Sequence, residues 1–278
     1  MRDREAYFIA SLQDSGVAMR LDDDGILLDD TIYAMDLFCE GVHFLRRCFG
    51  YYDIAKKAML VNISDILAMG AKPAYMLLGV SFARDMTLGD ISAFRRGIVD
   101  ICKQYGIKII GGDTIKDNKL NIAITMFGKV ESRIIKRTNF KAGDIVFFSG
   151  NLGSVSKDMQ SLYRGHKINK DSKFLAPRLN PKFMLEILPF VRGGMDISDG
   201  LYYELNRISR LNHVKFRFYK KINRRNALSG EEYELLFSIS PKDTRRLKLI
   251  ADKNRVKITK LAKMLRGREY FHCLPHHR

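Results

Sequence analysis

Cysteine is scarce in this sequence of 278 residues, and the four cysteines show neither a C-x-x-C pair nor the spacing of a metal-binding set. That distribution fits reduced, mostly buried thiols and disfavours a disulfide framework. Long apolar runs are also missing, because the richest one, residues 74–83, is too short to cross a bilayer. No apolar segment follows the charged opening residues 1–5, so a secretory signal is not expected. These absences predict a cytoplasmic protein that does not use a membrane.

Two common nucleotide-binding motifs are absent as well. The sequence contains no G-x-x-x-x-G-K-[ST] stretch, and the glycines of Gly111-Gly112-Asp113 lack the spacing of a dinucleotide fingerprint. A P-loop or Rossmann-type nucleotide site is therefore disfavoured.

Acidic residues are few relative to basic ones, with 31 Asp and Glu against 48 Lys and Arg, which gives a net charge of +17. Most of this excess lies in residues 203–278, where the net charge is +13. Basic pairs occur there, but no aromatic residues alternate with them as a base-stacking surface requires. We favour a solvated basic surface that steers anionic substrates, and keep a basic nucleic-acid-binding protein as the alternative from another class.

The pattern of strands and helices predicts a mixed α/β (α+β) protein. With 46% hydrophobic residues, the chain can form a globular core. Its 278 residues are many for one compact domain, so two domains are expected, residues 1–135 and 136–278. Helices are expected at 5–14, 53–69, 88–105, from 154, near 183, from 198 and at 243–253. Strands are expected as a hairpin within 26–44, at 75–82, a short buried one at 107–110, and at 120–130, 145–149, into 196, 214–219, 233–239 and 256–258.

Five acidic clusters adjoin apolar segments. They are Asp22-Asp23-Asp24-Gly25, Asp36, Asn62-Ile63-Ser64-Asp65, Gly111-Gly112-Asp113-Thr114 and Asp196-Ile197-Ser198-Asp199-Gly200. Each cluster alone is typical of a turn or a helix cap. Together they are costly unless cations join them, since like charges repel. Carboxylates beside glycines at strand and helix ends are typical magnesium ligands, and magnesium carries phosphates, so the pattern favours nucleotide-dependent chemistry.

Longer motifs resemble those of the thiamine-monophosphate kinase family, in that family's order and over nearly the whole chain. The matching stretches are Asp23-Asp24, Glu40-Gly41-Val42-His43-Phe44, residues 61–71, Ile110-Gly111-Gly112-Asp113-Thr114, residues 196–201 and residues 230–235. The family belongs to a superfamily of ATP-dependent enzymes that includes aminoimidazole ribonucleotide synthetase and selenophosphate synthetase.

This resemblance implies an N-terminal sheet that pairs across a homodimer in a barrel-like interface, and a C-terminal α/β domain beside it that completes the cleft. It also implies ATP-dependent phosphorylation of thiamine monophosphate to thiamine diphosphate with several Mg²⁺ ions. The implied metal ligands are Asp24, Asp36, Asp65, Asp113, Asp196 and Asp199. The implied ATP contacts are Gly112, Asp113, Arg137 and Ser198, and the implied substrate contacts are His43, Glu231 and Tyr270.

The chemistry of such a reaction needs no strong general base. A phosphate monoester has a second pKa of about 6, so the acceptor attacks as an anion at neutral pH. What the reaction requires is neutralised phosphate charge and in-line alignment, which predicts direct transfer without a phosphoenzyme.

The sequence departs from the family pattern in three places. Ala34 and Met35 replace the usual hydroxyl residues before Asp36, with Leu37 after it, which removes two oxygen ligands and leaves the number of metal ions open. Which aspartate of residues 22–24 points inward is also open, as is the effect of Ser229-Gly230-Glu231-Glu232 in place of the usual Gly-Gly-Glu-Asp.

Another ATP-dependent synthetase of the same superfamily is a further alternative. A selenophosphate synthetase needs a reactive Cys near its N-terminus, and none precedes Cys39. A hydrogenase-maturation homologue needs a terminal cysteine, whereas five residues follow Cys273. Both readings are disfavoured.

Overall fold

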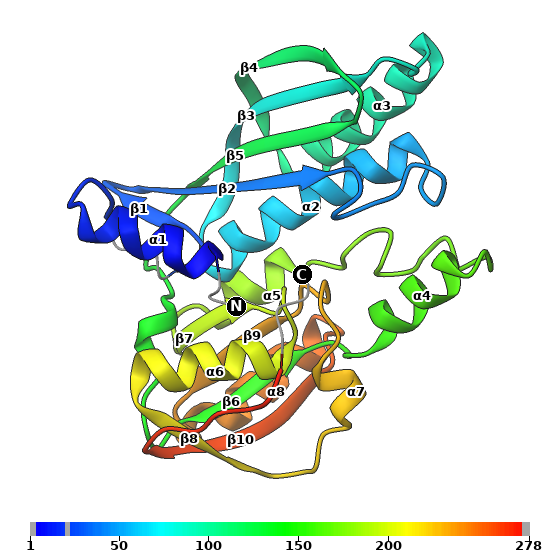
Figure 1. Cartoon of the computed structure of the whole chain (residues 1–278). Coiled ribbons are helices and arrows are strands. Elements are labelled where there is room, and N and C mark those ends of the chain that lie inside the picture. The colour runs from blue at the N-terminus through cyan, green and yellow to red at the C-terminus, as the bar shows by residue number, and fades with distance from the viewer. Residues whose placement is uncertain (1–3, 20–22, 274–278) are drawn as a thin grey trace.

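The computed structural model describes residues 4–19 and 23–273. Figure 1 shows two sheets with their helices, the N-terminal sheet above and the C-terminal sheet below. Each sheet has five strands within the described part of the chain. The prediction of a mixed α/β protein is therefore confirmed.

The N-terminal sheet has the strand order β1-β2-β5-β3-β4. Its strands are β1 (Ile26–Leu28), β2 (Thr31–Cys39), β3 (Lys72–Ala83), β4 (Lys108–Asp117) and β5 (Asn121–Lys129). The accompanying helices are α1 (Arg4–Asp14), α2 (Tyr51–Ala68) and α3 (Leu88–Tyr105). β3 and β4 run parallel and are joined through α3, whereas the other neighbours are antiparallel.

Local sequence signals explain where α3 begins and ends. Thr87 and Asp90 form a reciprocal capping box at its start, and Gly106 ends it in the left-handed conformation with φ +71°. Its buried side chains, among them Phe94 and Ile98, face α2 and the sheet. These signals lie in the helix or directly next to it, and the predicted bounds of this helix agree with the structure.

One face of the N-terminal sheet is covered by α2 and α3, and the opposite face is open. β5 alternates between buried and half-buried residues, while β4 is exposed along nearly its whole length. The prediction of a short buried strand at 107–110 was therefore wrong: β4 has ten residues and forms an exposed edge. Its apolar residues Ile109 and Ile110 suggested burial, but their side chains are 49% and 57% exposed among the described residues.

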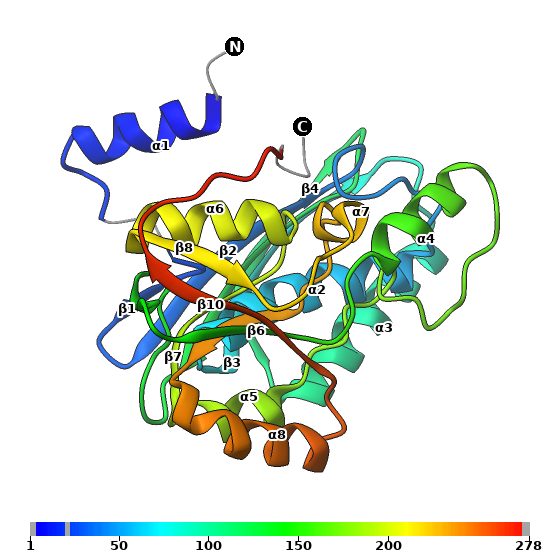
Figure 2. The same ribbon diagram turned by 90° about the horizontal axis from the view of Figure 1, so that it is seen from below.

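The C-terminal sheet has the strand order β7-β9-β6-β10-β8, and all its neighbouring strands are antiparallel. Its strands are β6 (Ile145–Ser149), β7 (Val191–Asp196), β8 (Val214–Phe218), β9 (Leu235–Ile239) and β10 (Ile258–Arg266). The helices are α4 (Ser154–Tyr163), α5 (Pro181–Ile187), α6 (Leu201–Asn212), α7 (Arg224–Ala227) and α8 (Thr244–Lys253). Figure 2 shows α6 on one face of this sheet and α5 with α8 on the other.

Two predicted bounds in this half were wrong. The helix expected from Ser198 begins at Leu201, because Gly200 has φ +105° and ψ 149°, a conformation that no helix accepts. The strand expected at 256–258 extends instead from 258 to 266. Residues 259–266 are rich in helix-forming Leu, Lys, Ala and Met, but pairing with both β6 and β8 decides their conformation.

Within the described part of the chain, no helix is long and apolar enough to cross a membrane.

Candidate active site

Three carboxylates meet where the two sheets face each other. Asp24 precedes β1, Asp65 lies in the last turns of α2, and Asp196 ends β7. Each offers an oxygen within 4.8 Å of the others. Two of them come from the N-terminal half and one from the C-terminal half, so only the packed chain brings them together.

Helix α2 positions this cluster through neighbouring polar residues. The Ser64 hydroxyl donates to Asp196 Oδ2 at 2.7 Å, which ties the helix to the end of β7. Asn62 lies three residues before Asp65 on α2, a spacing that predicts a shared helix face and a joint role at the site. Instead its Oδ1 accepts the backbone N–H of Asp36 at 3.2 Å, and its Nδ2 donates to the Ala58 carbonyl. Asn62 therefore fixes β2 against α2 at the position of Asp36.

The electrostatics of the cluster favour a bound cation. Burial raises the pKa of Asp65 well above its ordinary value, and the nearby Asp36, Asp196 and Asp24 raise it further. Burial and Asp24 likewise raise the pKa of Asp196, against the hydrogen bond from Ser64. Asp196 Oδ1 is buried and has no hydrogen-bond partner among the described residues. An acceptor in that state is costly without a cation or a proton.

Arg137 binds the first of these carboxylates. It opens the 3₁₀ turn Arg137–Asn139, where its guanidinium pairs with Asp24 Oδ1 and its backbone N–H donates to Asp23 Oδ1 at 2.6 Å. Burial alone lowers the pKa of Arg137, but Asp24 and the other carboxylates raise it, so the side chain stays charged. The side chain of Asp24 is 1% exposed and points inward, whereas Asp22 lies outside the described residues.

A cleft of about 340 Å³ opens beside the cluster. Many of the predicted site residues line it, from both halves of the chain: Asp24, Asp36, His43, Asp65, Arg137, Ser198 and Asp199. His43 is held there because its Nδ1 accepts the backbone N–H of Cys39 at 3.0 Å and its ring stacks on Phe38. Met35 and Leu37 also line the cleft, whereas Ala34 faces the core.

Gly112 and Asp113 lie apart from this cleft, on the exposed strand β4. Gly112 has φ +152°, and a Cβ there would lie 2.0 Å from the Leu78 carbonyl oxygen, so no other residue fits. The Asp113 carboxylate accepts the backbone N–H of Thr114 at 2.8 Å. The structure does not bring these two residues to the other predicted ligands within one chain.

The predicted substrate residues Glu231 and Tyr270 differ strongly in exposure. Glu231 is 2% exposed, and its Oε2 lies 2.6 Å from the Nζ of the buried Lys57. Tyr270 is 74% exposed and lines a second cavity, of about 490 Å³. Tyr203 and Arg207 line both that cavity and the cleft.

The substituted loop at 229–232 is held by its own hydrogen bonds. Ser229 Oγ donates to Glu232 Oε1 at 2.7 Å, and the same hydroxyl accepts the backbone N–H of Ser156 at 3.2 Å. Glu232 Oε1 also accepts the backbone N–H of Gly153 at 2.6 Å, at the start of α4. Ser229 therefore helps to fix Glu232 against α4.

Sequence reasoning missed Glu204 and Arg207 on α6. Glu204 is buried, and its Oε1 accepts the backbone N–H of Asp199 at 3.2 Å. Arg207 pairs with Glu204 at 3.2 Å and with Asp199 at 3.6 Å. Their spacing of three residues, directly after the predicted metal-binding stretch, was the available signal.

The N-terminal half of the chain matches a known family model, and the fold as a whole matches solved structures. Residues 21–130 match the family model described as AIR synthase related protein, N-terminal domain. The same fold also occurs in solved structures of other proteins. A hydrogenase maturation protein HypE, at 14% identity and a TM-score of 0.74, shares the fold over 94% of this chain.

Curated relatives identify the particular family. The thiamine-monophosphate kinase of Haemophilus influenzae is 30% identical over 281 residues, covering 91% of this chain and 85% of that protein. The kinase of Aquifex aeolicus is 28% identical over 227 residues, covering 73% and 74%. A crystal structure of the Aquifex aeolicus enzyme has a TM-score of 0.83 at 25% identity and covers 96% of each chain. The chain belongs to the thiamine-monophosphate kinase family, a family of phosphotransferases.

A further solved structure is of AaThiL complexed with AMPPCP and TMP. It has a TM-score of 0.85 at 24% identity and covers 98% of this chain and 94% of that one. At this identity the likeness establishes the shared fold.

Proposed function

We propose that this chain transfers the γ-phosphate of ATP to thiamine monophosphate, forming thiamine diphosphate and ADP. The observation that carries the proposal is the cluster of Asp24, Asp65 and Asp196 beside a polar cleft, in a chain of the thiamine-monophosphate kinase family. The AaThiL structure, which was solved with AMPPCP and TMP, supports the choice of both substrates.

Mg²⁺ fits the residues present. Carboxylates with raised pKa values and the unpartnered buried Asp196 Oδ1 form a hard oxygen donor set. We assign the metal ligands to Asp24, Asp36, Asp65, Asp113, Asp196 and Asp199. When bound to these carboxylates, Mg²⁺ would neutralise phosphate charge.

The protein's own residues orient the two substrates. Arg137, fixed by Asp24, directs a permanent positive charge to the triphosphate, and Ser198 and Gly112 contact the nucleotide. His43, Glu231 and Tyr270 hold the thiamine monophosphate. Because the acceptor phosphate is already an anion at neutral pH, none of these residues has to remove a proton, and transfer is direct and in line.

We further propose that residues 1–135 and 136–278 are the two domains, and that a homodimer forms through the open face of the N-terminal sheet in a barrel-like interface. Met35 and Leu37 on β2 and Ile110 and Ile115 on β4 are each more than half exposed, and such exposed apolar side chains support an interface on this sheet. Such a dimer brings Gly112 and Asp113 on β4 into the interface, which explains why they lie apart from the cleft of one chain.

The test is to incubate the purified chain with thiamine monophosphate, ATP and Mg²⁺ and to identify the products by mass. Asp36→Asn and Asp113→Asn should each abolish turnover and leave the fold intact, whereas Asp252→Asn, an exposed carboxylate on α8, should not change the rate. Absence of thiamine diphosphate over a range of Mg²⁺ concentrations would contradict the proposal. Salt-dependent binding of RNA or DNA without ATP turnover would favour the nucleic-acid-binding alternative.

A further inference from the structure

Three buried glutamates lie within four residues of one another after α7. Glu231, Glu232 and Glu234 are 2%, 1% and 4% exposed. Buried carboxylates remain charged only where cations and hydrogen bonds compensate the lost water. Two lysines from distant parts of the sequence supply this compensation.

Lys57 is the first of these lysines. It lies on α2, in the N-terminal half, and its side chain is fully buried with Nζ 2.6 Å from Glu231 Oε2. Burial lowers the pKa of Lys57, and the Glu231 carboxylate counteracts this effect. The rings of Phe174, Phe49 and Phe38 surround the ammonium group, with centroids 4.1, 5.5 and 6.0 Å from Nζ. The pair therefore joins the two halves of the chain in a dry, aromatic environment.

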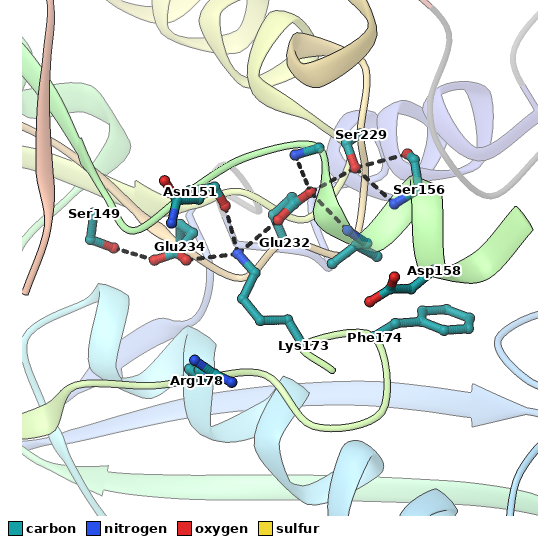
Figure 3. A network of polar contacts seen from close by, with 12 residues as sticks. Ser149, Asn151, Ser156, Asp158, Lys173, Phe174, Arg178, Ser229, Glu232 and Glu234 are labelled. Atoms are coloured by element: carbon teal, nitrogen blue, oxygen red, sulfur yellow. Dashed lines mark hydrogen bonds and ion pairs between the residues drawn. The ribbon is translucent and has the colours of Figure 1, made fainter. Parts of the chain in front are cut away.

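Lys173 is the second lysine, on the connection between α4 and α5. Figure 3 shows its ammonium group between Glu232 and Glu234, each 2.7 Å away, with the Asn151 carbonyl also at 2.7 Å. The next residue, Phe174, is the one that covers Lys57 most closely. Residues 173 and 174 thus contact Glu232 and Glu234 directly and Glu231 through Lys57. We call Lys57, Lys173, Phe174 and these three glutamates the clamp.

The segment 231–233 is hydrogen-bonded to backbone carbonyls of residues 197 and 198 beside the cleft. The backbone N–H of Glu231 donates to the Ser198 carbonyl at 2.6 Å, and that of Tyr233 donates to the Ile197 carbonyl at 2.9 Å. Glu231 and Tyr233 have φ +54° and +49°, left-handed values that residues other than glycine rarely adopt. Tyr233 also lines the cleft itself. Strained backbone of this kind persists only where its surroundings fix it.

We propose that Lys57 is a positioning residue for the acceptor side of the cleft. By holding Glu231, it fixes the segment 231–233 and, through the backbone bonds, the loop that carries Ser198 and Asp199. The proposal rests on the proposed function in so far as Glu231 contacts thiamine monophosphate. Nothing else in the clamp needs to touch either substrate.

The kinetic test compares Lys57→Met with the double variant Lys57→Met/Glu231→Gln. Lys57→Met removes the positive charge next to a buried carboxylate. It should therefore lower the Tm and raise KM for thiamine monophosphate by about 10-fold or more, with KM for ATP changed by less than about 3-fold. The double variant removes both charges and should recover most of the lost Tm while KM for thiamine monophosphate stays high. If the double variant has the parental KM, or if both KM values rise equally, the pair is only structural and the proposal is wrong.

Hydrogen exchange gives a readout that does not depend on turnover. Amides of residues 197–200 and 229–235 should exchange about 10-fold faster in Lys57→Met than in the parent. The matched control is Lys253→Met, which breaks the exposed pair with Glu186 at 3.0 Å and should leave both segments unchanged. Unchanged exchange in Lys57→Met refutes the clamp even if the parent makes thiamine diphosphate. Faster exchange in Lys57→Met, together with a parent that makes no thiamine diphosphate, supports the clamp and contradicts only the proposed function.

Discussion

Asp196→Asn should stabilise the metal-free protein and remove its response to Mg²⁺. The change keeps the size of the side chain and the acceptor for the Ser64 hydroxyl, which lies 2.7 Å from Asp196 Oδ2. It deletes one negative charge from three carboxylates that lie within 4.8 Å of one another. A functional site that binds a cation is expected to be strained when the cation is removed.

The magnitude follows from the geometry of the cluster. At about 4.8 Å and an effective dielectric constant of about 20, two ionised carboxylates repel by about 3.5 kcal/mol. Asp196 faces two such neighbours, Asp24 and Asp65, and the positive charge of Arg137 offsets part of the repulsion. Proton uptake at the raised pKa values limits this repulsion. We therefore expect the free energy of unfolding of Asp196→Asn to exceed that of the parent by about 2 kcal/mol, or about 4–8 °C in Tm.

The assay is thermal unfolding in EDTA and in 10 mM Mg²⁺. If the parent binds Mg²⁺ with a Kd of about 0.1 mM, it gains about 2.7 kcal/mol from the ion, whereas Asp196→Asn gains little. Asp144→Asn is the control, because Asp144 is equally buried but pairs with Arg192 at 2.9 Å and should be destabilised in both buffers. A lower Tm for Asp196→Asn in EDTA, or equal Mg²⁺ gains for parent and variant, would refute the reasoning.

Two further predictions concern assembly and alkaline stability. Ile110→Lys or Ile115→Lys on β4 should weaken dimerisation by about 30-fold or more, measured by sedimentation, while Leu249→Lys on α8 should have no effect; a monomeric parent would contradict the proposed interface. Burial raises the pKa of Tyr105 from 10.0 to about 12. Between these values the unfolded chain loses a proton that the folded chain keeps, so the free energy of unfolding should fall as pH rises through this window. Urea midpoints at pH 9 and 11.5 should differ less for Tyr105→Phe than for the parent, and equal differences would show that Tyr105 is not responsible.

Local sequence signals were enough for most elements and for naming the three carboxylates that the structure brings together. The capping box at Thr87 and the left-handed Gly106 set the ends of α3, and their partners lie within the same helix. The acidic clusters around Asp24, Asp65 and Asp196 were identifiable because carboxylates beside glycines at element ends repeat along the chain. Residue type and spacing alone carry this information.

Other features depended on contacts between distant residues. Whether β4 is buried depends on what covers its sheet, and the conformation of residues 259–266 depends on β6 and β8. Neither the pairing of Lys57 with Glu231 nor that of Lys173 with Glu232 has any signal in spacing, since each joins segments far apart in the sequence. The sequence by itself determined which carboxylates were available and where most elements begin and end, because these follow from local backbone preferences and side-chain chemistry. The tertiary structure alone decided which of those carboxylates meet and which lysines hold the cleft, because desolvation and charge pairing act through space.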